Sequence, residues 1–211
     1  MNTDPVAFFR EDFPALFNEG VSQIKARAEE GDDKATARHA DIAAAHGAVR
    51  VLLEGEGGGE LFLSVTGGTM TALDAAPGDL PLRMAFAGPA DAAKAALEEV
   101  EEAELITDKS PRRVARIASG EVEQMLSGHT LGFHATITDL PADPDEVTIR
   151  IAIGSGEPPA DPKFSATVSW DDIEDVRDGE MTPQQLFGRL KIVGDASQAM
   201  ALGMALMQRR R

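Results

Sequence analysis

The side chains that could carry acid–base or nucleophilic chemistry are few in this 211-residue chain and match no known catalytic pattern. The chain has no cysteine, which excludes disulfides, thiol catalysis, iron–sulfur clusters and thiolate zinc sites. Ser155 in "GSGEPP" does not stand in a G-x-S-x-G nucleophile motif. "GEGGGE" at residues 55–60 misses the last glycine of G-x-G-x-x-G and joins two strand-like segments, so we interpret it as a hairpin turn.

The histidines and the acidic segments do not predict a metal site. His129 and His134 are five residues apart and would face opposite sides of a strand. His39 and His46 are seven apart and could share a helix face, but no carboxylate is clearly placed as a third ligand. "DLPADPDE" and "DDIEDVRDGE" lack the glycine of a calcium loop and indicate solvated surface. Distant carboxylates can meet in space, so a paired-carboxylate hydrolase stays open as a third function, but no pair is singled out. We expect no metal, no cofactor and no catalytic residue.

The charge of the chain argues against polyanionic partners. With 20 basic and 36 acidic residues the net charge is -16, and only Arg209-Arg210-Arg211 forms a basic run. Binding to nucleic acid needs clustered lysine and arginine, so we expect no nucleic-acid partner, and we interpret the terminal run as a solvated tail in preference to a membrane contact. The start lacks the pattern of a signal peptide, and no window has 18 uninterrupted apolar residues. We therefore expect a soluble, cytoplasmic protein without an integral membrane segment.

Hydrophobic spacing predicts helices at the start of the chain and strands after it. Phe9, Phe13 and Phe17 recur at helical spacing, so residues 5–46 are predicted to be helical with a break at 31–33. "AVRVLLEG" and "ELFLSVTGG" predict a β-hairpin, a short strand is expected near Met70, and "LPLRMAFAG" predicts a further strand. "PADAAKAALEEVEEAELI" then predicts a helix with Pro89 near its first turn.

The second half of the chain repeats this order of elements. After a helical stretch, "SPRRVARIASGEVEQML", come two alternating strands, "LGFHATITDL" and "EVTIRIAIG", and a long loop. "KFSATVSW" predicts a third strand, "DDIEDVRDGE" a short acidic helix, "TPQQLF" a helix start, "RLKIVG" a strand, and "DASQAMALGMALMQ" a last helix with Asp195 as its N-cap. The repeated order indicates either an old tandem duplication with a degenerate first copy or a chance likeness of two βββα units. We divide the chain into an N-terminal helical segment (1–47) and two βββα halves (48–127 and 128–211).

One stretch of the second half, residues 164–207, has a more specific pattern. It reads Gly179-x-Met181-x-Pro183-Gln184, then Phe187, then "GRLKIVGD" at 188–195, then a helix of Ala, Met and Leu that includes Ala199-Met200. This pattern resembles the sterol carrier protein 2 (SCP2-like) family, although the link from Pro183 to Gly188 is shorter than in the family. The resemblance is weaker over 131–163 and weakest over 48–126. It implies an α+β fold with a twisted, mainly antiparallel sheet covered by helices, a degenerate SCP2-like half at 48–127, an SCP2-like C-terminal half at 128–211, and an apolar tunnel for lipids.

The methionines of the last helix have two interpretations. Met200, Met204 and Met207 follow one another at helical spacing, and their soft, unbranched side chains suit either a core or a wall that adapts to different ligands. Gly203 costs about 1 kcal/mol relative to alanine inside a helix and permits the close approach of another group. Periodicity alone favours an ordinary core, whereas the resemblance favours a tunnel wall.

The predicted function is the non-enzymatic binding or transfer of a fatty-acyl, sterol-like or other hydrophobic ligand in an apolar cavity. The affinity would come from burial of apolar surface, and one or two polar groups at the mouth would give specificity. The residues predicted to line the cavity are Phe164, Val168, Trp170, Met181, Gln184, Phe187, Ile192, Met200, Met204 and Met207. Gln184 either meets the polar end of the ligand or bonds to the backbone at its helix start. The alternative function is an SCP2-like interaction or accessory module whose cavity is filled and holds no ligand.

Overall fold

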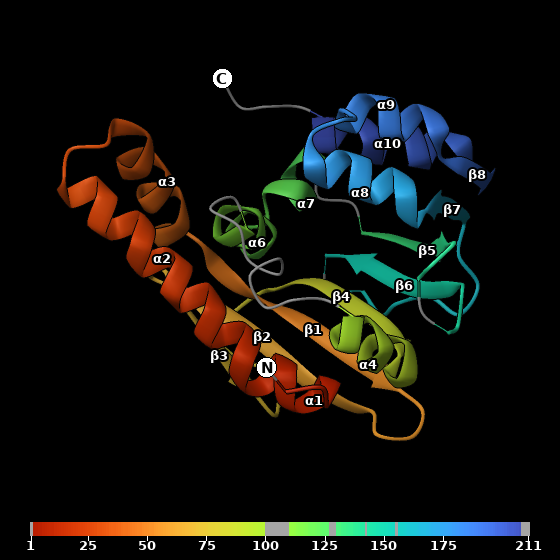
Figure 1. The fold of residues 1–211 in the computed structure, drawn as a ribbon, viewed down its shortest axis with the longest axis horizontal. Coiled ribbons are helices and arrows are strands. Elements are labelled where there is room, and N and C mark those ends of the chain that lie inside the picture. The colour runs from red at the N-terminus through yellow and green to blue at the C-terminus, as the bar shows by residue number, and fades with distance from the viewer. Residues whose placement is uncertain (1, 100–109, 127–129, 142, 155, 208–211) are drawn as a thin grey trace.

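The strands of this chain assemble into one twisted sheet. In the computed structural model, residues 2–99, 110–126, 130–141, 143–154 and 156–207 are described, and their strands form an eight-stranded sheet in the order β3-β2-β1-β4-β6-β5-β7-β8 (Figure 1). The strands are β1 (His46–Glu54), β2 (Gly59–Thr66), β3 (Thr69–Leu73), β4 (Leu82–Pro89), β5 (Leu131–Thr138), β6 (Val147–Ile153), β7 (Phe164–Ser169) and β8 (Lys191–Gly194). Only the β1–β4 and β5–β7 pairs of this described sheet are parallel. The predicted α+β class, with a mainly antiparallel sheet flanked by helices, is confirmed.

The helices form at the start of the chain, between strands and near its end. They are α1 (Pro5–Ala7), a π-helical turn η1 (Phe8–Asp12), α2 (Phe13–Glu29), α3 (Asp33–Ala43), α4 (Ala90–Glu99), α6 (Ser110–Ala118), α7 (Glu121–Met125), α8 (Trp170–Asp178), α9 (Pro183–Arg189) and α10 (Ala196–Met207). The predicted break at 31–33 is confirmed, because Asp32 caps α3 by accepting the backbone N–H groups of Lys34 and Ala35. The continuation of the helix predicted beyond Glu99, His129 and the terminal arginine run lie outside the described residues.

Several element boundaries differ from the prediction. The helix predicted to run to residue 46 ends at Ala43, and His46 already begins β1. Trp170, predicted to end a strand, is the first residue of α8. The helix predicted over 110–126 is split into α6 and α7, with Gly120 in the left-handed conformation between them. The strand predicted to start at Arg189 starts instead at Lys191, because α9 continues to Arg189. A capping box between Thr182 and Gln185 fixes the start of α9, and the helix then takes up residues that the alternation had assigned to the strand.

The strand pairing repeats itself along the sheet. In the first triplet, β2-β1-β4, the strand β1 pairs antiparallel with β2 and parallel with β4. In the second triplet, β6-β5-β7, the strand β5 pairs in the same way with β6 and β7. Each third strand leads directly into a helix, β4 into α4 and β7 into α8, and the β4–β6 pair joins the two triplets. The predicted repetition is present in the pairing, whereas the duplication as its origin and the domain boundaries stay predictions.

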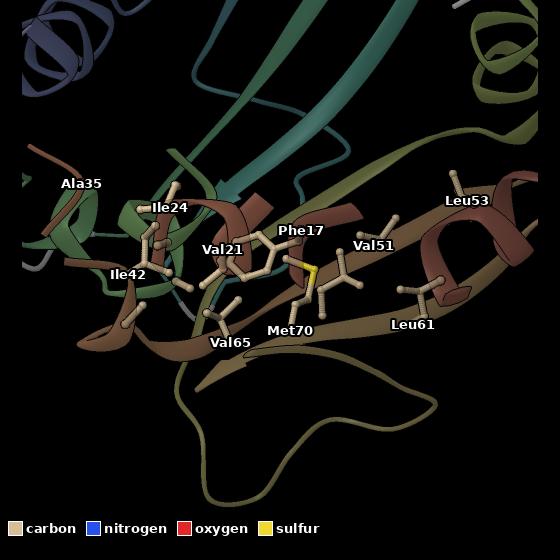
Figure 2. Close-up of a cluster of buried hydrophobic side chains, with 14 of the residues drawn as sticks. Phe17, Val21, Ile24, Ala35, Ile42, Val51, Leu53, Leu61, Val65 and Met70 are labelled. Atoms are coloured by element: carbon tan, nitrogen blue, oxygen red, sulfur yellow. The ribbon is translucent and has the colours of Figure 1, made fainter. Parts of the chain in front are cut away.

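Two hydrophobic clusters lie on the same face of the sheet. The first packs α2, α3 and α6 onto β1, β2 and β3, and Figure 2 shows Phe17 and Val21 of α2 directed toward Met70 and Val65. The second packs α7 and α10 onto β1, β4, β5, β6 and β7, and its buried members are Val49, Met84, Val122, Leu131, Ile153, Phe164, Ala199 and Leu202. Because Val49 of the second cluster and Val51 of the first are two residues apart on β1, both clusters share one face of the sheet. On the opposite face, the small residues Gly132 and Ala152 are paired with each other, which leaves room there for the loop between β6 and β7.

Candidate functional site

Several residues predicted to line a cavity lie in the core between the sheet and the C-terminal helices. Phe164 is 2% exposed and stacks on Phe133, with ring centroids 5.1 Å apart and planes 4° from parallel. Ile192 packs against the same cluster, and Met181 is buried between α8 and α9. Val168, Trp170 and Phe187 are half-buried, on β7, α8 and α9 respectively.

Met200 and Met204 of α10 do not point into that core. Met200 and Met204 are 56% and 55% exposed, while Ala199 and Leu202 of the same helix are buried. The close approach predicted at Gly203 is confirmed: a Cβ atom placed there would lie 2.2 Å from Cε2 of Phe187. The smallest residue of this helix thus lets the α9 ring pack directly against its backbone.

Two residues predicted to line the cavity remain, Gln184 and Met207. Gln184 is exposed, and the backbone bonds at the start of α9 are made by its neighbour Gln185. The side chain of Met207 lies outside the described part of the chain. The structure therefore does not gather the ten predicted residues around one cavity, and their role in binding a ligand stays a prediction.

A pocket of about 760 Å³ lies elsewhere, at one end of β5 and β6. Its lining is Met125, Leu126, Thr130, Leu131, Gly132, Ala152, Ile153, Gly156, Glu157, Pro159, Asp161, Lys163, Gln198 and Ala201. The apolar members come from α7, α10 and the two strand ends, and the charged members come from the loop between β6 and β7. Apolar side chains therefore line one side of the pocket and charged side chains the other, in about equal share.

Strand pairing and helix geometry bring the apolar members together. Leu131 at the start of β5 is the register partner of Ile153 at the end of β6, so the two side chains lie next to each other. Successive residues of a helix are about 100° apart around its axis, so Ala201 and Met200 face different sides of α10. The helix α10 therefore has one side toward the core, a second toward the pocket, which Gln198 and Ala201 line, and a third toward solvent.

The loop between β6 and β7 is fastened to the face of the sheet opposite the helices. His134 Nε2 is 2.8 Å from the carbonyl oxygen of Pro159, and a Cβ atom at Gly132 would lie 2.8 Å from Pro159 Cγ. Arg50 of β1 donates from Nη1 to a carboxylate oxygen of Glu157 and from Nε to Glu60 Oε1 at 2.6 Å. The bonds from His134 and Arg50 hold the polar rim in place, and the lack of a side chain at Gly132 leaves space for the ring of Pro159.

The helix α7 is held over the other side of the pocket by an ion pair. Arg83 of β4 donates from Nη1 to Glu123 Oε2 at 3.0 Å, and its carbonyl oxygen accepts the N–H of Gly154 at 2.8 Å. The side chains of Arg83 and Glu123 are about one quarter exposed. Nε of Arg83 is buried and has no hydrogen-bond partner in the part of the chain that the structure describes. One residue of β4 thus positions both α7 and the start of the loop.

The charges around the rim are only partly compensated. The hydrogen bond from Arg50 to Glu157, together with the one to Glu60, raises the pKa of Arg50 above its ordinary value, and one guanidinium is shared by two carboxylates. The pKa of Asp195 is lowered, first by the hydrogen bond from the Ser197 hydroxyl and also by the nearby charge of Lys163. Asp195 accepts the N–H groups of Ser197 and Gln198, which confirms its predicted place at the start of α10.

Comparison with known proteins adds little to this geometry. No protein-family model and no curated protein matches the chain. Among solved structures, the chain is similar to sterol carrier protein 2 from Yarrowia lipolytica in its apo form, with 18% identity, a TM-score of 0.27, and coverage of 41% of this chain and 70% of that one. A TM-score this low does not establish a shared fold, so membership of the SCP2-like family stays a prediction.

Two further structural findings concern metals and membranes. No group of three or more histidine, aspartate or glutamate side chains that could hold a metal ion occurs within the described ranges. None of the helices described is long and apolar enough to span a membrane.

Sequence reasoning did not single out the residues of the pocket. The pocket includes the last two residues of a predicted helix, Met125 and Leu126, and three residues of a predicted loop, Gly156, Pro159 and Asp161. Hydrophobic periodicity does not mark the residues of either segment as the lining of a cavity. The available signal was the length of that loop, because a long connection within a compact domain is often functional.

Proposed function

We propose that this protein binds a hydrophobic small molecule, without catalysing a reaction on it, in the pocket at the ends of β5 and β6. The observation that carries the proposal is the pocket itself, whose volume of about 760 Å³ falls among those of small-molecule sites, roughly 300–1,000 Å³. The SCP2-like pattern at 164–207 supports the same ligand class, a fatty-acyl chain, a sterol-like molecule or another lipid. Transfer between membranes would be a further step of that function.

The lining accounts for how such a ligand would be held. Leu131 and Ile153 form an apolar floor, Met125 and Leu126 line it from the α7 side, and Ala201 lines it from α10. Apolar surface removed from water stabilises a complex by about 25 cal/mol per Å². A ligand that buries 200 Å² of apolar surface would therefore gain on the order of 5 kcal/mol before the cost of association is subtracted.

A specific observation also favours the alternative function, an interaction or accessory module without a ligand. The space between the sheet and α10, where the family resemblance implies a tunnel, is occupied by the Phe133–Phe164 stack and by Leu202. Met200 and Met204 lie on the outer side of α10 and are available for contact with another molecule. Under this alternative, the protein would release no lipid on extraction and the pocket would bind no hydrophobic probe.

The experiment that separates the two functions combines native mass spectrometry of the purified protein with titration of a fluorescent fatty acid. The matched variants are Ala201→Phe and Met200→Phe, which place the same ring on adjacent residues of α10. Ala201→Phe adds a ring at the α10 side of the pocket and is expected to weaken probe binding at least tenfold, because the ring takes space that the probe would occupy. Met200→Phe points to solvent and is expected to bind the probe as the parent protein does. Absence of co-purified lipid and of probe binding at micromolar concentration would reject the binding function.

A further inference from the structure

We infer that the pocket selects amphiphiles whose polar end is positively charged, in preference to carboxylates with the same apolar chain. The inference rests on the proposed function, because it assigns the chemistry of the ligand's polar end at that same site. Its basis is the balance of charges along the rim, which comes from one loop and its partners on the sheet.

The ion pairs of Arg50 with Glu157 and Glu60 determine which charges of the rim are left for a ligand. Glu157 lines the pocket and is bonded to Arg50, but Arg50 is also bonded to Glu60, so the group of three carries a net negative charge. Lys163 is the cation among the lining residues, and its charge acts on Asp195. Asp195 also lies beside Lys163 along the backbone, since its N–H donates to the Lys163 carbonyl oxygen at 2.9 Å. The negative charge of Asp195 therefore offsets part of the attraction that Lys163 would exert on a bound carboxylate.

Asp161 supplies a negative charge that no described residue pairs with. It lines the pocket and is exposed, and none of the hydrogen bonds or ion pairs of the described residues involves it. Its place in the same loop as Glu157 puts both carboxylates on one side of an apolar floor. A bound ammonium group would lie near net negative charge, whereas a bound carboxylate would be repelled, and the overall charge of -16 acts in the same direction.

The test uses three probes with the same twelve-carbon chain: dodecylamine, dodecanol and dodecanoate. Each is titrated by calorimetry below its micellar concentration, at neutral pH and low salt. An exposed charge pair changes affinity by up to about fivefold, and attraction and repulsion add, so dodecylamine is expected to bind roughly tenfold more tightly than dodecanoate. The preference should shrink in concentrated salt, because exposed charges are screened.

Three substitutions at exposed positions test which charges cause the preference for the amine. Asp161→Asn is expected to lower the ratio of amine to carboxylate affinity by about threefold, and Lys163→Gln to raise it by a similar factor. Glu146→Gln makes the same charge change just before β6, seven residues and roughly 20 Å from the pocket end of that strand, and is expected to leave the ratio unchanged.

The outcomes distinguish this inference from the proposed function. If dodecanoate binds as tightly as dodecylamine, or if Glu146→Gln changes the ratio as much as Asp161→Asn does, the inference is overturned while ligand binding stands. If none of the three probes binds, the proposed function fails and the inference fails with it.

Discussion

Replacing Phe164 with alanine tests whether the space beneath α10 is a filled core or a ligand tunnel. Phe164 is 2% exposed and stacks on Phe133. Removing a buried phenylalanine ring costs about 3–5 kcal/mol, because the transfer free energy is lost and a cavity remains. For a chain of this length each kcal/mol lowers the midpoint of thermal unfolding by roughly 2–4 °C, so Phe164→Ala should lower it by roughly 6–20 °C.

The assay is urea unfolding followed by circular dichroism, with a double-mutant cycle. Phe133→Ala and the double variant complete the cycle, and the coupling free energy between the two rings should be about 0.5–1.5 kcal/mol. Val193→Ala, at a position that is 72% exposed on β8, is the control and should change the free energy of unfolding by less than about 0.5 kcal/mol. If Phe164→Ala costs less than about 1 kcal/mol and also weakens binding of a fluorescent fatty acid, Phe164 lines a ligand cavity and the core described above is wrong.

Three further predictions concern individual elements. Thr182→Ala removes the capping box of α9 and should lower the free energy of unfolding by about 1 kcal/mol in urea titrations, and an unchanged value would show that α9 starts elsewhere. The pKa of Asp195 is lowered by the Ser197 hydroxyl, so its charge stabilises the fold above the ordinary pKa of 3.8, and this contribution disappears as the pH falls through the lower folded-state value. The parent protein should therefore be more stable than Asp195→Asn at neutral pH, with the difference shrinking in the acid range, and a difference that grows on acidification would contradict the sign. Gly47→Ala would place a Cβ atom 2.3 Å from the carbonyl oxygen of Ala118, so it should destabilise the fold by about 1–3 kcal/mol or more, measured as a loss of soluble protein and a lower unfolding midpoint.

Most elements of the fold were predictable because their apolar residues recur with a clear period. The hairpin of β1 and β2 and the break before α3 follow from alternation and from a capping aspartate. The parallel pairs were not predictable, because alternation shows which face a side chain takes but not which strand lies beside it.

The orientation of α10 shows that residue spacing is equally limited in predicting a binding site. Met200 and Met204 share a helix face, as their spacing predicts, but spacing alone does not say whether that face turns inward. The small residues Ala199 and Gly203 decide it, since they allow the helix to pack closely against the sheet and against Phe187. The pocket was beyond prediction for a different reason: its walls come from α7, two strand ends, a loop and α10, which meet only in the folded chain.

The β4–β6 pair has a consequence for how the chain can be divided. It is the ladder that joins the two triplets, and Met84, Ala85, Phe86 and Ala87 are matched there with residues 150–153. A protein cut between α7 and β5 would leave each fragment with an unpaired apolar edge strand, and such edges recruit other chains. Neither fragment alone should remain monomeric. The two fragments mixed together should recombine by pairing β4 with β6. The chain could therefore be divided at this pair to build a split reporter.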